Sequence, residues 1–549
     1  MGRGAERGRA ARSSVANFLG RLEHGIGSRR GSAAVVAVAL VVYGLQSIAL
    51  PVVPGRDFGT YLRFYVQMFE WHSVLPMSML FRTPVAPLVV GGSLDLVGGY
   101  GTQALMAVLF ATSILCWTRT ALVFGPRAAL VVVVALVLYP GYGILFHMLA
   151  SDSICALVFA VWALLLSRAW LEPEAARFAL VGLATATAAL TRPGYQVLVV
   201  FALVPLVRAV PWRARLAAVA SCVGVVVVVL GSWAALNGLR YDDYALARGG
   251  GAFFPFYRAF VSDRIVSPDN GPASRELADA VRLELLPEQP YRGYGITLDR
   301  FFSQAGPREF EDLVGLSDRS WGWGSDYAQL RKAGIEAVRA HPGRYARGVG
   351  RTVVDELWSP LFVALPHGAA TPSLQRAAVS RQTVVAHPTG PPFLPPPSEG
   401  ETIPAAHQGF FSTTPDGSVT EIWTSPTDHG LHFSTASAQR RFGEVDAETN
   451  ELDALVAPYP GSRWLTLQFS RSSRLFPPPL VWLVIGLVAW VWRRPARSGL
   501  AACLAGAALL VIAFQALAVY SIIEFAIPVA PALVVFGAAG LVGQRQEII

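Results

Sequence analysis

Charged side chains stand beside apolar segments at three places that are far apart in this sequence. Asp57 comes a few residues after the first long apolar segment, Asp152 opens the fourth, and Arg192 separates the fifth from the sixth. A carboxylate within hydrogen-bond reach of a hydroxyl can act as its general base. A guanidinium can bind a phosphate through two parallel hydrogen bonds. Together these residue types suit a reaction between a hydroxyl acceptor and a donor with a phosphate leaving group.

The acidic candidates also have a simpler interpretation. Aspartate is a favoured helix N-cap, and this role is open both for Asp57 and for the dipeptide Ser151–Asp152. His147 lies in the same short turn as Asp152 and is either an interfacial side chain or part of the site. The capping and chemical roles are compatible with one another.

The basic candidates have two interpretations as well. Arg192 and Arg82 are either arginines at the level of the lipid headgroups or ligands of a phosphate. Glu524, which opens the last apolar segment, is a further candidate on the same face. The sequence contains no P-loop, no zinc-ligand spacing and no nucleophile elbow.

The composition is that of a membrane protein. Of the 549 residues, 53% are hydrophobic and only 15% are charged, whereas soluble domains have about a quarter charged residues. The net charge of +8 comes mostly from arginines in short loops between apolar segments. Such arginines set the orientation of a chain in the membrane, so the positive charge predicts no nucleic-acid partner. The four cysteines all lie inside apolar segments, where they are expected to be small buried side chains.

Ten apolar segments predict an α-helical polytopic fold, because about 20 apolar residues cross a bilayer. No small-residue cleavage site follows the first one, so it is expected to be a retained span. The predicted segments are 33–53, 101–123, 127–146, 152–170, 177–191, 194–209, 215–236, 477–492, 498–519 and 524–543.

The arginines predict the orientation. Ten spans place both termini on one side, and every short loop on that side carries arginine, as cytoplasmic loops do. We therefore expect a multi-pass protein of the cell inner membrane, with Asp57, Asp152 and Arg192 on the extracytoplasmic side. The lipid bilayer is thus the first partner that the sequence predicts.

Polar stretches divide the chain into modules. The stretch after the seventh span is long enough for its own core, and we expect a mixed α/β domain there. Within it, 326–358 predicts a helix broken at His341–Gly343, and alternation in 405–470 predicts strands. The first predicted module is a basic cytoplasmic tail (1–31), and the second is a transmembrane module (32–238) with a first outer loop (54–100). An extracytoplasmic domain (239–476) with a Pro-rich insertion (366–400) follows. The last module consists of C-terminal transmembrane helices with a short cytoplasmic tail (477–549).

Five short segments of the chain resemble the GT-C superfamily of integral membrane glycosyltransferases. The likeness is to the bacterial members related to protein mannosyltransferases and aminoarabinose transferases, and it extends over 30–365 and 477–545. The matching segments are Arg56–Tyr61, Arg82–Pro87, His147–Asp152, Thr191–Pro193 and Val338–Tyr345.

The resemblance implies roles for individual residues. Asp57 would be the catalytic or acceptor-orienting carboxylate, Asp152 the second acidic residue, and Arg192 a ligand of the lipid phosphate. The remaining substrate-binding candidates are Arg82, His147, Tyr61 and Glu524. The donor would be a polyprenyl-phosphate sugar, used on the outer face with inversion at the anomeric carbon. Family members often have an Arg-Tyr pair before the last span, where this chain has Ile522–Phe525.

Three functions follow as hypotheses. The first is a glycosyltransferase acting on an envelope glycan, lipid or protein. The second is a lipid-linked glycan transporter or flippase, which would need charges deep in the bundle, whereas these apolar segments are largely uncharged in their middles. The third is a non-catalytic envelope scaffold. Two carboxylates are compatible with a divalent cation, Mg²⁺ or Mn²⁺, and the spacing leaves metal dependence open.

Overall fold

The computed structural model of this chain describes most of its 549 residues. The described residues are 25–69, 81–208, 210–287, 291–292, 295–358, 411–412, 419–423, 429–433, 435–456, 461–473, 475–493, 495–519 and 525–544.

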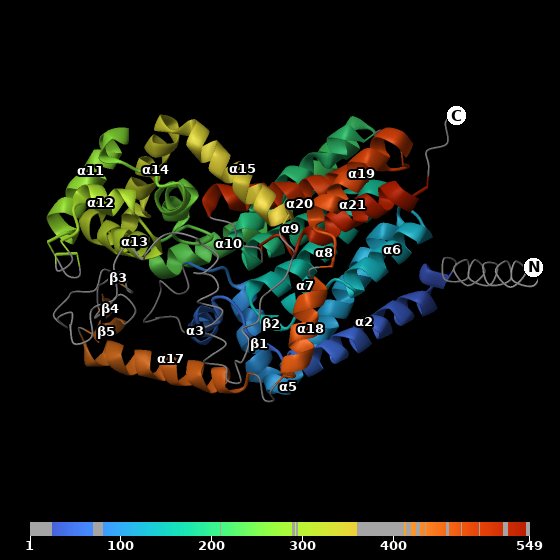
Figure 1. The fold of residues 1–549 in the computed structure, drawn as a ribbon, viewed down its shortest axis with the longest axis horizontal. Coiled ribbons are helices and arrows are strands. Elements are labelled where there is room, and N and C mark those ends of the chain that lie inside the picture. Colours follow the sequence, from blue (N-terminus) through green and yellow to red (C-terminus); the bar gives the residue numbers. More distant parts are fainter. Residues whose placement is uncertain are drawn as a thin grey trace, which may run out of the picture.

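Apolar helices form one large bundle, which occupies the right of Figure 1. Within the described residues, five helices have the length and composition to cross a membrane: α2 (Arg29–Ala49), α5 (Val85–Leu122), α8 (Ser151–Leu171), α10 (Trp212–Tyr241) and α20 (Ser498–Ala518). Shorter apolar helices complete the bundle: α6 (Pro126–Val137), α9 (Ala175–Thr191), the 3₁₀ helix η1 (Pro193–Val207), α19 (Pro479–Arg493) and α21 (Ala530–Val542), together with the six-residue α7 (Pro140–Leu145).

The outside of this bundle is as apolar as its inside. Trp117 and Trp162 are fully buried between helices. On the outer faces of α2 and α10, Val41 is 62% exposed and Val228 is 66% exposed. Apolar side chains on both faces of a helix are stable where the surroundings are lipid, and the backbone groups inside a helix are paired with one another. The chain is therefore a multi-pass α-helical membrane protein.

Each of the ten predicted apolar segments contains helix. The break predicted at Arg192 separates α9 from η1. The first outer loop differs from the predicted range 54–100, because α5 begins at Val85 and continues into the second predicted segment. Gly98, with φ of 65°, marks a kink inside α5. The apolar residues after Pro84 extend the helix, and the polar part of the loop ends there.

A second body of helices lies beside the bundle and has its own core, centred on residues such as Phe256, Phe301 and Leu313 (Figure 1). The predicted break at His341 is confirmed, because α14 ends at Ala340 and α15 begins at Pro342. The helices of the second body are η2 (Ala252–Ser262), η3 (Pro268–Asn270), α11 (Pro272–Ala280), η4 (Val281–Leu285), α12 (Leu298–Ser303), α13 (Pro307–Trp321), η5 (Trp323–Ser325), α14 (Ala328–Ala340) and α15 (Pro342–Trp358).

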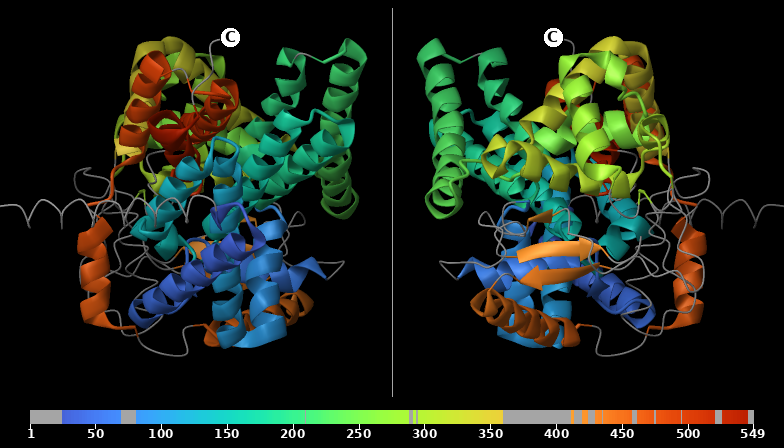
Figure 2. Two further views of the ribbon diagram at one scale, coloured as in Figure 1. Left: turned by 90° about the vertical axis from the view of Figure 1, so that its right-hand side faces the viewer. Right: turned by 90° about the vertical axis from the view of Figure 1, so that its left-hand side faces the viewer.

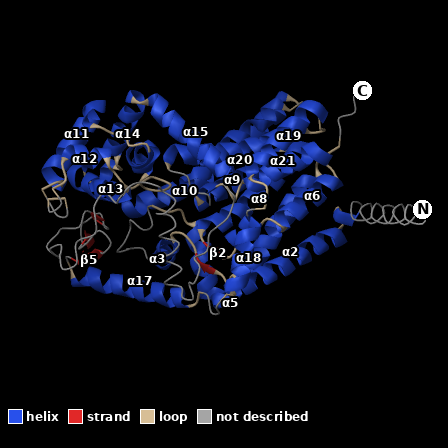
Figure 3. Cartoon of the chain, viewed as in Figure 1, coloured by secondary structure: helices blue, strands red, loops and turns tan. Residues whose placement is uncertain are grey.

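The later part of the predicted extracytoplasmic domain is only partly strand. An antiparallel sheet has the order β3 (Phe411–Ser412), β4 (Val419–Trp423) and β5 (His429–Phe433) and lies beside α17, as Figures 2 and 3 show. The prediction of strands up to residue 470 is wrong, because α17 (Ala436–Ala454) and α18 (Arg463–Ser473) are helices. Alternation is confined to the β4 region, and α17 is rich in the strong helix formers Ala, Glu, Gln and Arg. The Pro-rich insertion 366–400 lies outside the described residues.

Two side chains join the second body to the end of α20. The last carbonyls of a helix have no partner within it. Arg258 donates to the carbonyl of Ala516 at 2.7 Å, and the Tyr345 hydroxyl donates to the carbonyl of Leu517 at 2.6 Å. Arg258 is buried and also pairs with Asp263 at 3.0 Å. The joint therefore places the second body at a fixed position on the bundle.

Replacing Arg258 tests this joint. Arg258→Met leaves the Asp263 carboxylate buried without its partner, which costs about 3–5 kcal/mol. We expect a clear fall in the thermal unfolding midpoint of the purified protein. The matched control is Arg344→Met, because Arg344 is exposed and donates only to the Asp263 carbonyl at 3.1 Å. Equal midpoints for the two variants would contradict this account.

Candidate functional site

A two-residue parallel bridge brings two distant parts of the chain together. Strand β1 (Val53–Pro54) pairs with β2 (Met148–Leu149) in the register Val53 to Met148 and Pro54 to Leu149. The Val53 amide donates to the His147 carbonyl at 2.9 Å. Asp57 follows β1 by three residues and Asp152 follows β2 by three residues. Because parallel strands run in the same direction, the two aspartates leave the bridge on the same side.

Asp57 stands at the N-cap of α3 (Phe58–Met68), yet its side chain makes no capping hydrogen bond. Its φ is 59°, a left-handed conformation that aspartate tolerates better than most residues. The carboxylate instead pairs with Arg82, at 3.2 Å between Oδ2 and Nη2, and is 34% exposed. The capping interpretation therefore describes the backbone position of Asp57 and leaves its carboxylate for other contacts.

Asp152 lies in the first turn of α8 and belongs to a buried polar chain. Arg192 donates to Asp152 Oδ1 at 2.6 Å and to Ser151 Oγ at 2.9 Å. The Tyr61 hydroxyl donates to the same Ser151 Oγ at 2.9 Å. The side chains of Asp152 and Arg192 are 4% and 15% exposed. Tyr61 lies on α3, so these hydrogen bonds connect α3, which follows Asp57, with α8, which contains Asp152.

Phe525 connects the Asp152–Arg192 pair with the segment that contains Asp57. The guanidinium of Arg192 lies 4.4 Å from the centre of its ring, and the guanidinium of Arg56 lies 5.7 Å from the same ring. Cations are attracted to the faces of aromatic rings. Three arginines and two aspartates thus gather here.

The arginines set the electrostatics of Asp57 and Tyr61. Burial by itself would raise the pKa of Asp57, but the guanidinium groups of Arg82, Arg56 and Arg192 hold this pKa below its usual value. Burial, together with the negative charge of Asp57, raises the pKa of Tyr61 to about 12. At neutral pH the site therefore contains an ionised carboxylate and a protonated phenol.

One predicted residue lies away from these contacts. His147 is buried, and its ring stacks on Tyr43 of α2 at 4.1 Å between ring centres. Its backbone carbonyl accepts from Val53, and its substrate-binding role stays a prediction. Glu524 lies outside the described residues.

Three residues that take part in these contacts were not among the predicted site residues. Arg56 directly precedes Asp57, Ser151 directly precedes Asp152, and Phe525 directly follows Glu524. Each therefore adjoins a predicted site residue in the sequence, and this adjacency was the signal by which it could have been found. The cation–π contacts of Phe525 could not be inferred, since they join segments more than 300 residues apart.

The described residues contain no group of three His, Cys, Asp or Glu side chains that could hold a metal ion. Both aspartates have an arginine partner. A divalent cation between them would have to displace a guanidinium.

Comparisons with known proteins give a distant likeness. No family model and no curated protein matches the chain. Among solved structures, it is similar to ArnT from Cupriavidus metallidurans bound to undecaprenyl phosphate, with 16% identity, a TM-score of 0.35, and coverage of 93% of this chain and 78% of that chain. It is also similar to the oligosaccharyltransferase AglB from Archaeoglobus fulgidus in complex with an inhibitory peptide and a dolichol-phosphate, with 14% identity, a TM-score of 0.36, and coverage of 93% of this chain and 50% of that chain. Both solved proteins belong to the GT-C superfamily. These superpositions are loose, and no residue role is carried over from them.

The bridge leaves no room for a side chain at Gly55. A Cβ there would lie 2.7 Å from the Ala150 Cβ and 3.0 Å from the Leu149 carbonyl oxygen. We expect Gly55→Ala to force the strands apart at a cost of about 1–3 kcal/mol. Amide exchange of a peptide covering 53–58, measured by mass spectrometry, should then be about tenfold faster.

The matched control for this test is Gly59→Ala. Gly59 is exposed on α3 and has no heavy atom within 4 Å of its Cβ position, and alanine favours the helix. Its exchange should be unchanged or slower. Unchanged exchange in Gly55→Ala would mean that the bridge does not constrain this segment.

Proposed function

We propose that this chain is a membrane glycosyltransferase that moves a sugar from a polyprenyl-phosphate donor to a hydroxyl of a cell-envelope acceptor. The observation that carries the proposal is the β1–β2 bridge, which brings Asp57 and Arg56 to the Asp152–Arg192 pair at the ends of apolar helices. The site would open to the extracytoplasmic side of the cell inner membrane. The acceptor would be an envelope glycan, lipid or protein.

The arginines favour a phosphate donor. Arg56 and Arg192 approach one phenylalanine ring, so that two guanidinium groups lie beside the Asp152–Arg192 pair. Guanidinium groups bind phosphate oxygens in a fixed fork geometry. Arg192 follows α9 directly, at the end of an apolar helix, where the phosphate of a lipid-linked donor would lie at the membrane surface with its polyprenyl chain in the bilayer.

The reaction needs one bond to form as another breaks. The acceptor oxygen attacks the anomeric carbon, the bond from that carbon to the phosphate oxygen breaks, and its electron pair goes to the departing polyprenyl phosphate. Attack opposite the leaving group inverts the anomeric carbon. Arg192 and Arg56 would stabilise the negative charge that develops on the phosphate. The acceptor proton would pass to Asp57, whose side chain is 34% exposed, whereas that of Asp152 is only 4% exposed.

The lowered pKa of Asp57 defines how it would act. A carboxylate ionised at neutral pH is a strong hydrogen-bond acceptor and a weak base. It would orient the acceptor hydroxyl in the ground state and take its proton late, when bond formation to the anomeric carbon has given the attacking oxygen positive charge and made its proton acidic. The rate should therefore not titrate with Asp57 at pH values above the ordinary aspartate range.

Two alternative functions receive less support. A lipid-linked glycan transporter would place charges in the middle of its spans, whereas Asp152 and Arg192 stand at helix ends. A non-catalytic scaffold would not need Asp57 and Asp152 side by side, and the bridge with its Tyr61–Ser151–Arg192 chain supports their proximity. No step of the proposed reaction depends on a divalent cation.

The direct test is Asp57→Asn. Loss of the carboxylate should lower the rate of sugar transfer by at least about 100-fold, the usual range for a general base. Transfer is measured in membranes with candidate polyprenyl-phosphate sugars, and the unfolding midpoint is measured to show that the variant is folded.

Asp95→Asn is the matched control. Asp95 is an exposed carboxylate of the same outer region, and it accepts a hydrogen bond from Tyr65 at 2.6 Å. This control removes the same charge and should leave transfer within about twofold of the starting protein. Full transfer by a folded Asp57→Asn variant would remove Asp57 as the base.

A further inference from the structure

Phe81 connects the first outer loop with the extracytoplasmic helical body. Its ring lies 6.4 Å from the ring of Phe253 in an edge-on arrangement and 6.1 Å from the ring of Tyr327. Both partners belong to the second core rather than to the membrane bundle. Aromatic pairs at these separations add about 0.5–1.5 kcal/mol to the burial of their surface.

Gly249 forms the floor of this contact. Its φ is +93°, a conformation in which side chains are strained, and a Cβ there would lie 2.6 Å from Phe81 Cε1. The ring of Phe81 therefore rests directly on the backbone of residue 249. Phe253, Tyr327 and Gly249 together are called the Phe81 socket below.

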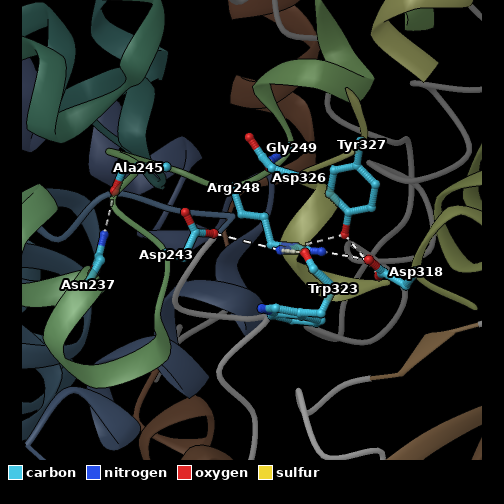
Figure 4. A network of polar contacts seen from close by, with 9 residues as sticks. All are labelled: Asn237, Asp243, Ala245, Arg248, Gly249, Asp318, Trp323, Asp326 and Tyr327. Carbon is cyan, nitrogen blue, oxygen red and sulfur yellow. Dashed lines mark hydrogen bonds and ion pairs between the residues drawn. The ribbon is translucent and has the colours of Figure 1, made fainter. Parts of the chain in front are cut away.

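A buried network of polar contacts around Arg248 includes Tyr327 of the socket (Figure 4). Arg248 donates to the Tyr327 hydroxyl at 3.0 Å and to Asp318 at 2.6 Å, and the Tyr327 hydroxyl donates to Asp318 at 3.1 Å. The guanidinium of Arg248 also stacks on Trp323 at 3.7 Å. Arg248 and Tyr327 each have several partners and therefore have little freedom to move. Tyr327 is thus a fixed wall for Phe81.

The residue after Phe81 is the arginine that pairs with Asp57. Arg82 donates from Nη1 to the Phe81 carbonyl at 3.3 Å and pairs from Nη2 with Asp57 at 3.2 Å. Its side chain is 30% exposed, and ion pairs between partly exposed side chains contribute only about 0–1 kcal/mol. Such a pair is too weak to order a loop. Something else must place the backbone of residue 82.

We propose that Phe81 is a positioning residue: docked in its socket, it holds the Arg82 guanidinium at the Asp57 carboxylate. The extracytoplasmic body thereby takes part in the site, although Phe81 itself touches none of the reacting groups. The meaning of this contact for catalysis rests on the proposed function, whereas the contact and its effect on Asp57 do not.

The proposal predicts a change in the ionisation of Asp57. Among the described residues, the charged and titratable groups that act on it are Arg82, Arg56, Arg192 and Tyr61. Tyr61 is uncharged at the relevant pH because its pKa is about 12. Burial raises the pKa of Asp57 and the three arginines lower it. When Phe81 leaves its socket, Arg82 no longer contributes fully, and the pKa of Asp57 rises.

Chemical labelling measures this change without any transfer reaction. A water-soluble carbodiimide with glycine ethyl ester modifies protonated carboxyl groups, and mass spectrometry of the purified full-length protein gives the modified fraction of Asp57 at each pH. We expect Phe81→Ala to move the Asp57 labelling midpoint to higher pH. Phe81→Leu, which keeps most of the apolar contact, should restore most of the original profile. The exposed Asp95 serves as the internal reference.

Four further variants complete the design. Arg82→Gln should move the midpoint at least as far as Phe81→Ala, and the double variant should equal Arg82→Gln. Gly249→Ala should act like Phe81→Ala, because its methyl group occupies the position of the ring. Phe254→Ala is the control, since Phe254 is 41% exposed and stacks on Phe514 at 6.0 Å.

The outcomes separate this proposal from the proposed function. If Phe81→Ala leaves the midpoint unchanged while Arg82→Gln moves it, or if the double variant moves it further than Arg82→Gln alone, Phe81 does not act through Arg82. If Arg82→Gln also has no effect, the ion pair does not form and the proposal fails. Transfer by Phe81→Ala should fall about tenfold, the effect of losing one charge-assisted hydrogen bond. A protein that is not a transferase would still show the labelling shift.

Discussion

The structure of the site depends on a very short parallel pairing between β1 and β2. The segments that form it are buried, and buried backbone groups must be paired. The amides of Val53 and Gly55 donate to the carbonyls of His147 and Leu149, and Pro54, which has no amide hydrogen, lies between them where no donor is needed. Two hydrogen bonds thus fix the relative position of two loops that are about as far apart in the chain as a small domain is long. The equal offset of Asp57 and Asp152 follows from this register.

Charge organises what the bridge brings together. Removing Asp152 and Arg192 from water is costly, and such a pair is stable only when the remaining polar atoms also have partners. Ser151 supplies one of these partners and is in turn bonded by Tyr61. The paired groups therefore act as a scaffold, which holds the guanidinium groups of Arg192 and Arg56 beside the ring of Phe525.

The site draws on more than the membrane bundle. Arg82 reaches Asp57 from a loop whose Phe81 packs on the second core, and Arg258 fixes that core on the end of α20. On another side, α17 packs on α3, with Asp446 and Arg63 3.0 Å apart. Elements from the second body, the bundle and α17 thus converge on the short helix that follows Asp57. An arrangement of this kind lets parts inside and outside the apolar bundle influence one carboxylate.

The sequence by itself determined the membrane class, the ten apolar segments, the break at His341 and the residue types at the helix ends. These features depend on local hydropathy, periodicity and turn chemistry, which are properties of neighbouring residues. It also pointed to Asp57, Asp152 and Arg192, but it left open whether the aspartates were only caps. The tertiary structure alone decided that Asp57 pairs with Arg82 and that Asp152 pairs with Arg192. It also decided that Phe525 joins the two halves. Such partners are chosen by packing between segments tens to hundreds of residues apart, and no local pattern encodes that choice.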